Sequence, residues 1–278
     1  MTAAAPARAR PVRPARSLFV PLAVVGFMVV SWWSLSSEFG IGFDLGALIE
    51  NITRGARILY RDNPINPADR GLLNPNWAFL ASTVEPMIET FQMAVIAAVV
   101  GCGLALPISF VASRVTAPGR ATLFGVRGVL SVVRAIPDIL YALVFVAAVG
   151  IGPLPGILAL VLFNIGVVAK LMSETIDGVD PGPIEAAQAS GANQTQTVRW
   201  SVLPQVLPHY VAYSLYTFEL NIRASTVLGI VGAGGIGRIL YREYARFNWS
   251  NVSVIIVELF VFVFVIEVVS IWLRRRLV

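Results

Sequence analysis

Six long apolar runs limit the folds open to this chain more than any other feature of its sequence. An α-helix needs about 20 apolar residues to cross the roughly 30 Å hydrocarbon core of a bilayer. Charged residues make up only 13% of the chain, against roughly 25% in a soluble globular protein, so they cannot cover a soluble surface. The runs are Leu18–Leu35, Met87–Ala112, Gly128–Val149, Pro155–Leu171, Val202–Leu220 and Val252–Leu273. We therefore predict an all-α polytopic membrane protein with six transmembrane helices.

The segments around these runs give the expected domain layout. Residues 1–17 are rich in Ala, Pro and Arg, which indicates a disordered basic tail. Residues 18–35 would form the first transmembrane helix. A basic flank before an apolar run also fits a signal peptide, but no small-residue cleavage site follows. Residues 36–82 are polar, and we expect an extracytoplasmic loop with a short amphipathic piece at Leu45–Tyr60. Residues 83–278 would hold five further transmembrane helices.

The arginines set the expected orientation, because short cytoplasmic loops carry an excess of Lys and Arg. With six spans, the basic tail, the loop from Arg114 to Arg127 and the triplet Arg274–Arg276 all lie on the cytoplasmic side. This predicts a multi-pass protein of the cell membrane with both termini in the cytoplasm. A group of arginines on the expected outer side departs from the rule: Arg223, Arg238, Arg242 and Arg246.

A glycine-rich segment lies before the last run. The sequence from Gly232 to Gly237 matches G-x-G-x-x-G, with Glu258 about 20 residues on, as in dinucleotide-binding folds. However, Glu258 lies in an apolar run, and no strand–helix–strand unit surrounds the glycines. Each glycine costs a helix about 1 kcal/mol relative to alanine, so a continuous helix is not expected. Two roles stay open, lining a cavity with non-helical backbone and close helix packing. The glycines are Gly229, Gly232, Gly234, Gly235 and Gly237.

A polar interval, Ser173–Ser201, separates the fourth and fifth runs on the expected cytoplasmic side. Pro183 suits the first position of a helix, where a missing N–H is no loss, and Glu185 would then lie in the first turn. This helix is short and made of small residues, and Gly191 interrupts it. A second short helix can run over Asn193–Trp200. A small-residue helix offers little side chain of its own and fits a groove on another protein.

These residues resemble the EAA loop of the permease subunits of ABC importers. The resemblance lies in Glu185-Ala186-Ala187, in Gly191 four residues later, and in Leu203-Pro204. In that family the loop carries a cytoplasmic coupling helix that docks on the ATPase. Ser201 departs from the pattern, because an aliphatic residue is usual there. The resemblance implies that Glu185, Ala186, Ala187 and Gly191 couple the chain to an ATPase.

A second resemblance is to the permease subunits of phosphonate importers. It lies in the segment Asn221–Gly237 and in Arg134-Ala135-Ile136-Pro137-Asp138, and with the EAA loop it covers roughly residues 80–278. Methionine-importer permeases share a related glycine-rich segment and are the nearest competing assignment. The resemblance implies a permease homodimer, two cytoplasmic ATPase subunits that hold ATP and Mg, and an extracytoplasmic binding protein. No cofactor is expected on this chain.

Four polar residues are candidates for a substrate path. Arg134 and Asp138 are four residues apart, so on a continuous helix they share a face and can pair. Charges within a bilayer face the bundle interior or a water-filled cavity. An internal ion pair and contact with an anion both stay open for them. Asn221 and Arg223 follow the fifth run, and arginine recognises phosphonate oxygens through forked hydrogen bonds. Contacts of the outer arginines with a binding protein or lipid headgroups are equally open.

The chain lacks the residues of an ATPase or a hydrolase. A phosphate-binding loop needs a lysine after glycines, and the single lysine, Lys170, has no such loop. One cysteine, Cys102, and one histidine, His209, exclude a disulfide framework and a Cys/His zinc cluster. We therefore expect a transport subunit rather than an enzyme. A self-contained anion channel or secondary transporter is the alternative class, but it would not need an EAA loop.

Overall fold

The computed structural model describes residues 19–36, 45–60 and 65–277, and the regular elements within these ranges are helices, with no strand. The chain divides into two compact units, residues 1–56 and 57–278, and each is considered by itself. The predicted basic tail, residues 1–17, lies outside the described residues.

The first unit holds α1 (Phe19–Ser36) and most of α2 (Leu45–Tyr60). Helix α1 is apolar around its whole circumference and measures about 27 Å at 1.5 Å per residue. Helix α2 has one apolar and one polar face, and it lies where the sequence predicts an amphipathic piece. The last residues of α2, from Arg57 on, belong to the second unit.

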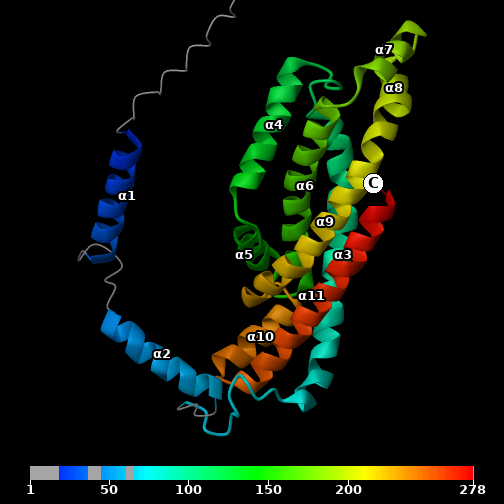
Figure 1. The fold of residues 1–278 in the computed structure, drawn as a ribbon. Helices are drawn as coiled ribbons and strands as arrows, with labels where there is room; N and C mark the ends of the chain where they lie inside the picture. The colour runs from blue at the N-terminus through cyan, green and yellow to red at the C-terminus, as the bar shows by residue number, and fades with distance from the viewer. Residues whose placement is uncertain (1–18, 37–44, 61–64, 278) are drawn as a thin grey trace, which may run out of the picture. The chain divides into compact units, whose positions relative to one another are not determined.

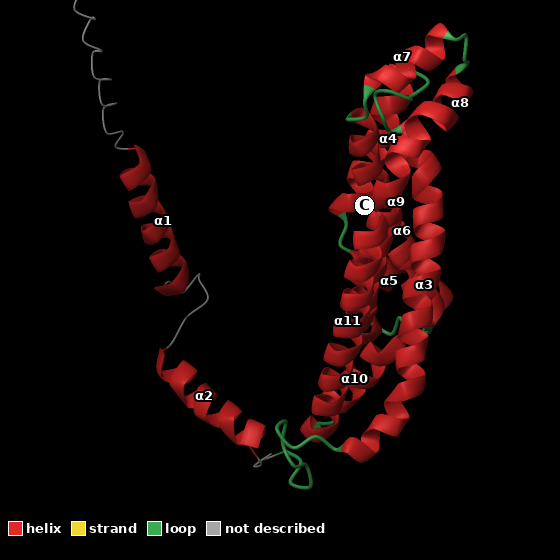
Figure 2. Ribbon diagram, turned by 45° about the vertical axis from the view of Figure 1, so that its right-hand side comes forward, coloured by secondary structure: helices red, strands yellow, loops and turns green. Residues whose placement is uncertain are grey.

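Four long helices form the framework of the second unit (Figure 1). Helices α3, α6, α9 and α11 lie side by side in both views, with α3 packed against α6 and α9 (Figure 2). Their bounds are α3 (Leu80–Val111), α6 (Pro153–Asp177), α9 (Leu203–Ile230) and α11 (Trp249–Leu277), and the 3-10 turn η1 (Trp77–Phe79) precedes α3.

Small residues let α3 approach its neighbours closely. Ala94, Ala97 and Ala105 on α3 are fully buried. A Cβ placed on Gly101 would lie only 2.5 Å from the Cβ of Asn164 on α6. Without a hydrophobic driving force between helices in lipid, close backbone packing of this kind is what holds a bundle together.

The run Gly128–Val149, expected to be one span, is two helices. Helix α4 (Arg120–Ala135) and helix α5 (Asp138–Val149) meet at an angle of 85°. Pro137 explains the break, because a proline disfavours helical backbone in the residue before it, and Ile136 is indeed extended, with φ −91° and ψ 123°.

Helix α9 is longer than the run Val202–Leu220 that predicts it. The short α8 (Gln194–Thr197) continues through a π turn, Val198–Val202, directly into α9. The helix runs through Leu203 and Pro204 without a break, because both lie in the first turn of α9, where proline is tolerated. At its other end α9 reaches Ile230, a turn follows, and α10 (Gly235–Ala245) leads to α11.

The lengths of the helices confirm a membrane protein but not the count of six spans. Three described helices are long and apolar enough to cross a bilayer, Trp77–Val111, Pro153–Asp177 and Trp249–Arg276. The number rises to five if the bent pairs α4–α5 and α9–α10 each count as one span, the second pair bending by 42°. The apolar stretch of α1, Phe19–Ser34, is shorter than the 18 residues required here of a helix that could cross a bilayer.

Helices α7 (Pro181–Ala189) and α8 lie at one end of the second unit, and α10 lies toward the other (Figures 1 and 2). We call these the α7 end and the α10 end. At each end, one carboxylate holds neighbouring elements together. At the α10 end, Asp69 accepts hydrogen bonds from the backbone N–H groups of Trp249 (3.1 Å) and Ser250 (2.9 Å) at the start of α11. It thereby binds the positive end of a helix dipole.

At the α7 end, Asp177 ties three elements together. It accepts hydrogen bonds from the Ser113 hydroxyl (2.7 Å) and the Arg114 backbone N–H (2.6 Å), and it pairs with Arg127 of α4 (2.7 Å). Arg127 also donates to the backbone oxygen of Ala112, at the end of α3 (2.7 Å). The ends of α3 and α6 and the middle of α4 are thus joined by one carboxylate.

Asp177→Ala should lower the stability of the purified protein by about 2 kcal/mol, because hydrogen bonds to charged groups contribute about 1.5–3 kcal/mol each and Arg127 loses its partner. Thermal unfolding in detergent measures this. The control is Glu174→Ala on the same helix, where a largely exposed pair with Lys170 is lost and little change is expected. Equal melting temperatures for the two variants would contradict the role given to Asp177.

Candidate functional site: the coupling loop and the polar residues of the core

Helix α7 holds the residues that resemble the EAA loop, and it begins two residues earlier than expected. Pro181, and not Pro183, occupies its first helical position, because Asp180 caps the helix by accepting a hydrogen bond from the Gly182 N–H (2.9 Å). Glu185 therefore lies in the second turn of the helix, away from the positive end of its dipole. No residue of α7 is buried.

The residues that the EAA-loop resemblance assigns to coupling lie on this exposed helix and at the turn that ends it. Glu185 and Ala186 are exposed and Ala187 is half-buried. Gly191 has φ +83°, and its N–H donates to the Gln188 oxygen (2.9 Å), which closes the C-terminal turn of α7. A residue with a side chain is strained in this left-handed conformation. The left-handed turn therefore explains in physical terms why a glycine stands at position 191.

Hydrogen bonds connect α7 to the helix that follows. The Ser201 hydroxyl donates to the Pro183 oxygen (2.9 Å). The Gln205 side chain accepts from the Asp180 N–H (3.0 Å), and its amide donates to the Asp180 oxygen (3.4 Å). Ser201, the residue that departs from the family pattern, thus makes a polar contact with α7. Since Ser201 and Gln205 belong to the continuous helix α8–α9, these bonds join α7 to that helix.

A further contact fixes the start of α8. Asn193 and Gln196 form a reciprocal capping box, with both bonds at 2.9 Å. The Gln194 side chain donates to the Thr116 oxygen in the turn between α3 and α4 (2.9 Å). The coupling loop is therefore attached to α9 on one side and to the α3–α4 turn on the other.

The glycine-rich segment breaks the helix and packs tightly. Gly232, Gly234 and Gly235 have φ of +89°, +86° and +70° in the turn between α9 and α10. Gly152, in the turn before α6, donates its N–H to the Gly232 oxygen (3.1 Å). A Cβ on Gly234 would lie 2.8 Å from the Cα of Pro153. The turn is thus wedged against the start of α6.

The two outer glycines allow α9 and α10 to meet. A Cβ on Gly229 would lie 2.6 Å from the Cα of Gly237, and a Cβ on Gly237 would overlap the carbonyl oxygen of Thr226. The Ile236 N–H donates to the Thr90 hydroxyl on α3 (2.8 Å). The glycine-rich segment therefore both breaks the helix and packs closely. That this segment lines the substrate path stays a prediction.

Arg134 and Asp138 do not form the expected pair, because the break at Pro137 places them on different helices. Arg134 is in the last turn of α4 and is exposed, and its side-chain carbons lie over Gly166 of α6. Asp138 opens α5 and accepts a hydrogen bond from the Ile139 N–H (2.9 Å). In the described part of the chain no ion pair involves either residue.

Asn221 is fully buried and holds α9 to α3. Its side-chain amide donates to the Ala94 oxygen (3.3 Å), one turn from the place where Asn164 of α6 donates to the Ala97 oxygen (2.9 Å). The side-chain oxygen of Asn221 has no partner among the described residues. The direct task of Asn221 is therefore to join two helices.

Arg223 lies inside α9 and not after it. It pairs with Glu219 one turn earlier, and Glu219 also accepts a hydrogen bond from Arg274 of α11 (3.3 Å). Glu219 is only 7% exposed, so it is a buried carboxylate with two cations. Arg223 and Glu267 also line a cavity of about 420 Å³ between α9 and α11. Arg274 belongs to the triplet that the sequence assigns to orientation alone, and this contact was not foreseen.

The other arginines of the expected outer side also meet acidic partners within the chain. Arg238 lies 4.0 Å from Glu89 of α3. Arg242 pairs with Glu243 at 3.0 Å, and Arg246 lies 3.9 Å from the same carboxylate. Glu243 is 3% exposed and also accepts hydrogen bonds from the side chains of Asn248 and Asn251. Each of these arginines therefore has an acidic partner within 4.0 Å.

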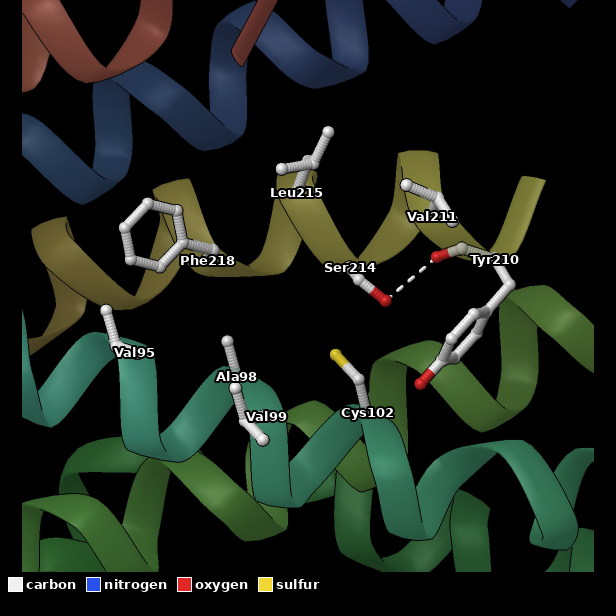
Figure 3. Close-up of a pocket in the computed structure, with 9 residues that line it drawn as sticks. All are labelled: Val95, Ala98, Val99, Cys102, Tyr210, Val211, Ser214, Leu215 and Phe218. Atoms are coloured by element: carbon white, nitrogen blue, oxygen red, sulfur yellow. Dashed lines mark hydrogen bonds between the residues drawn. The ribbon is translucent and has the colours of Figure 1, made fainter. Parts of the chain in front are cut away.

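A cavity of about 480 Å³ lies between α3 and α9 (Figure 3). Its walls are almost wholly apolar. The Ser214 hydroxyl in the wall donates to the backbone oxygen of Tyr210 (2.8 Å), and the Cys102 sulfur contacts the Thr217 hydroxyl (3.3 Å). The lining residues are Val95, Ala98, Val99, Cys102, Tyr210, Val211, Ser214, Leu215 and Phe218. No basic residue is among them, so this cavity does not suit an anion.

The fold and the exposed coupling loop agree with a family match. Residues 105–278 match the family described as the inner membrane component of binding-protein-dependent transport systems. More than half of the chain is matched, including all of α4 to α11 up to Leu277. The chain therefore belongs to this family of transport permease subunits.

Two relatives indicate which kind of transport permease the chain resembles. The chain is 41% identical over 190 residues to the phosphate-import permease protein PhnE of Mycolicibacterium smegmatis, an alignment that covers 68% of this chain and 36% of that protein. It is 39% identical over 203 residues to the phosphite transport system permease protein PtxC of Stutzerimonas stutzeri, covering 73% of this chain and 74% of that protein. The chain thus spans about a third of the first relative's length. These names confirm the resemblance to phosphonate-type ABC permeases.

Among solved structures, the chain is similar to the MetNI methionine ABC transporter in an inward facing conformation. The TM-score is 0.64 at 26% sequence identity, and the match covers 72% of this chain and 98% of that chain. This agreement confirms the ABC permease fold of the second unit.

Gly237→Ala should destabilise the protein by about 1–3 kcal/mol, the usual cost of overpacking a filled site, because the new methyl group overlaps the Thr226 carbonyl. Gly103→Ala on α3 is the matched control, since a Cβ there meets nothing within 4 Å and the exchange favours a helix. Thermal unfolding of both variants in detergent checks this. A Gly237→Ala protein as stable as the control would refute the close packing of α9 and α10.

Proposed function

We propose that this chain is the permease subunit of an ATP-driven importer that carries phosphonate, or a similar anion such as phosphite or phosphate, across the cytoplasmic membrane. The single observation that carries this proposal is the exposed helix α7, which is braced against α9 by Ser201 and Gln205. Relatives with permease names for phosphate and phosphite support the choice of cargo.

In this proposal α7 docks on a cytoplasmic ATPase subunit. Its small, unburied side chains leave a smooth surface that suits a groove, and Glu185 adds one charge. ATP and Mg are held by the ATPase and not by this chain. Two copies of the permease form the path between them, and closure of two ATPases moves both α7 helices. The path then alternates between inward and outward access, and a binding protein delivers the anion from outside.

The proposed orientation places both termini and residues 173–201 in the cytoplasm and residues 36–82 outside. The first transmembrane helix would be residues 18–35, and residues 83–278 would form the permease core. The α7 end of the second unit then faces the cytoplasm, and the α10 end faces the binding protein. The basic residues near the α7 end, such as Arg127, agree with an inner location.

Arg134 is the stronger of the two arginine candidates for the substrate path. It is exposed and has no acidic partner among the described residues, whereas Arg223 is already paired with Glu219. An unpaired guanidinium can offer its forked donors to a phosphonate. Passage requires that such contacts stay weak or brief. Asp138, Asn221, Arg223 and the glycines Gly229, Gly232, Gly234, Gly235 and Gly237 keep a proposed place along the path.

Two other functions remain to be tested against this one. The similarity to the methionine transporter structure favours a methionine-type permease as the second candidate. A self-contained anion channel or secondary transporter is a further alternative. The deciding experiment is the ATPase activity of the reconstituted complex with its binding protein, measured with phosphonate, phosphite, phosphate and methionine. We expect stimulation by at least one of the three anions and not by methionine. Anion transport by the chain alone, without ATP, would contradict an importer.

Gly191→Ala should uncouple ATP hydrolysis from transport, because the left-handed turn that ends α7 becomes strained and the docking surface shifts. We expect stimulation by the loaded binding protein to fall by about tenfold, the effect of roughly 1.4 kcal/mol, with Glu185→Ala acting in the same direction. Gly119→Ala is the control, because it lies near the same end with φ −176° and open space around it. Normal stimulation in both coupling variants would exclude the role of α7.

Arg134→Ala should reduce anion uptake about tenfold or more, because a hydrogen bond to a charged group contributes about 1.5–3 kcal/mol. Arg134→Lys should recover part of the uptake, since it keeps the charge but not the fork. Uptake of radiolabelled phosphate-type anions into proteoliposomes measures both. Arg120→Ala, at the other end of α4, should leave uptake unchanged. An Arg134→Ala protein with normal uptake would remove this residue from the path.

A further inference from the structure

Helix α2 has two chemically different faces that the permease function does not use. Leu48, Ile49 and Ile52 are 41%, 59% and 62% exposed, and Ala56 and Tyr60 continue the same face at helical spacing. Since α2 precedes residues 105–278, it lies outside the family match. An apolar face this exposed needs something other than water to cover it.

The opposite face of α2 is polar and carries positive charge. Arg54 and Arg57 lie on it with Glu50 and Asn51. Glu50 pairs with Arg54 at 3.0 Å, but both side chains are largely exposed, and such a pair contributes little stability. Arg57 has no acidic partner within 4.0 Å among the described residues. This face can therefore offer cationic donors to phosphate groups.

Along the chain, α2 lies between two apolar helices. On its N-terminal side, only residues 37–44 separate α2 from the apolar helix α1. On its C-terminal side, the segment before α3 is bound to the start of α11. Asn66 donates to Asn248 (2.7 Å), Asp69 caps α11, and Asn76 donates to Asn251 (3.0 Å). The side chain of Asn74 also donates to the backbone oxygen of Tyr60, at the end of α2 (3.5 Å).

The aromatic residues near this boundary fit the same location. Tyr60 is 70% exposed at the end of α2, and Trp77 is 58% exposed just before α3. Tyrosine and tryptophan are enriched at the level of the lipid headgroups, where one end of the ring is apolar and the other polar. Most of the stability of a helix in a protein comes from the packing of its apolar face and not from helix propensity, so a surface that binds the apolar face of α2 would stabilise it.

We propose that α2 is an interfacial helix that lies in the plane of the bilayer surface. Its apolar face is covered by acyl chains at the headgroup boundary, and Arg54 and Arg57 contact the phosphates of anionic lipid headgroups. A strongly two-faced helix with arginines on the polar side and bulky apolar residues on the other is the chemistry that binds such a surface. The lipid surface is favoured over a protein partner because α2 stands between the apolar helices α1 and α3 along the chain and its polar face carries the cations that anionic headgroups attract.

The test uses the full-length chain in vesicles, with one spin label in each variant. Cys102 is buried and is replaced by serine to leave no other thiol. The label is attached at Ile52→Cys on the apolar face and at Arg54→Cys on the polar face, as a matched pair two residues apart. Accessibility to oxygen, which concentrates in lipid, is compared with accessibility to a nickel chelate, which stays in water. Vesicles contain phosphatidylcholine alone or equal parts of phosphatidylcholine and phosphatidylglycerol.

We expect the ratio of oxygen to nickel accessibility to be several-fold higher at residue 52 than at residue 54. The ratio at residue 52 should rise further when phosphatidylglycerol is present, and Arg57→Gln should remove most of that rise. Equal nickel access at both positions would place α2 in water and overturn the proposal. Protection of residue 52 from both probes would also overturn it, because the apolar face would then pack on protein. A ratio at residue 52 that is the same in both vesicles would overturn the contact with anionic headgroups.

Discussion

The close approach of α3 to its neighbours is the constraint on which the second unit depends. In lipid, apolar side chains gain little from leaving their surroundings, so the helices are held by backbone proximity and by polar contacts. Ala97 and Gly101 supply the proximity to α6. Asn164 and Asn221 supply the polar contacts, because each donates to a carbonyl of α3. The tight turn between α9 and α10 can pack beside α3 only because this framework is already narrow.

A second constraint is that the buried carboxylates Glu219 and Glu243 are each paired with two arginines. Glu219 is shared by Arg223 and Arg274, and Glu243 is shared by Arg242 and Arg246. A buried carboxylate that lost its cation would carry a large desolvation cost. Arg134 differs from these, since the break at Pro137 separates it from Asp138. Arg134 is exposed, and an unpaired cation beside a helix break supports its proposed contact with an anion.

Most of the fold could be predicted from apolar runs and motifs, but contacts between distant residues could not. The two faces of α2 are visible in sequence, because they depend only on spacing within one helix. The break between α4 and α5 was not predicted, because Gly128–Val149 is one apolar run and the separation of Arg134 from Asp138 depends on how α5 packs. The contact of Arg274 with Glu219 joins residues 55 apart, and no local pattern signals it. The hydrogen bond of Ser201 to the Pro183 oxygen is likewise a contact between residues far apart in the sequence, so the motif shows Ser201 only as a departure from its pattern.

The π turn at Val198–Val202 has a consequence for the geometry of coupling. In a regular α-helix each residue rotates the chain by about 100°, and a π turn holds one residue more than an α-helical turn. The five residues between α8 and α9 therefore set the angular phase between α8 and the polar side chains of α9. Removing one residue there would turn α8 by about 100° relative to Glu219. The direction in which α8 presents Gln194 to the α3–α4 turn is in this sense set by the length of a single turn.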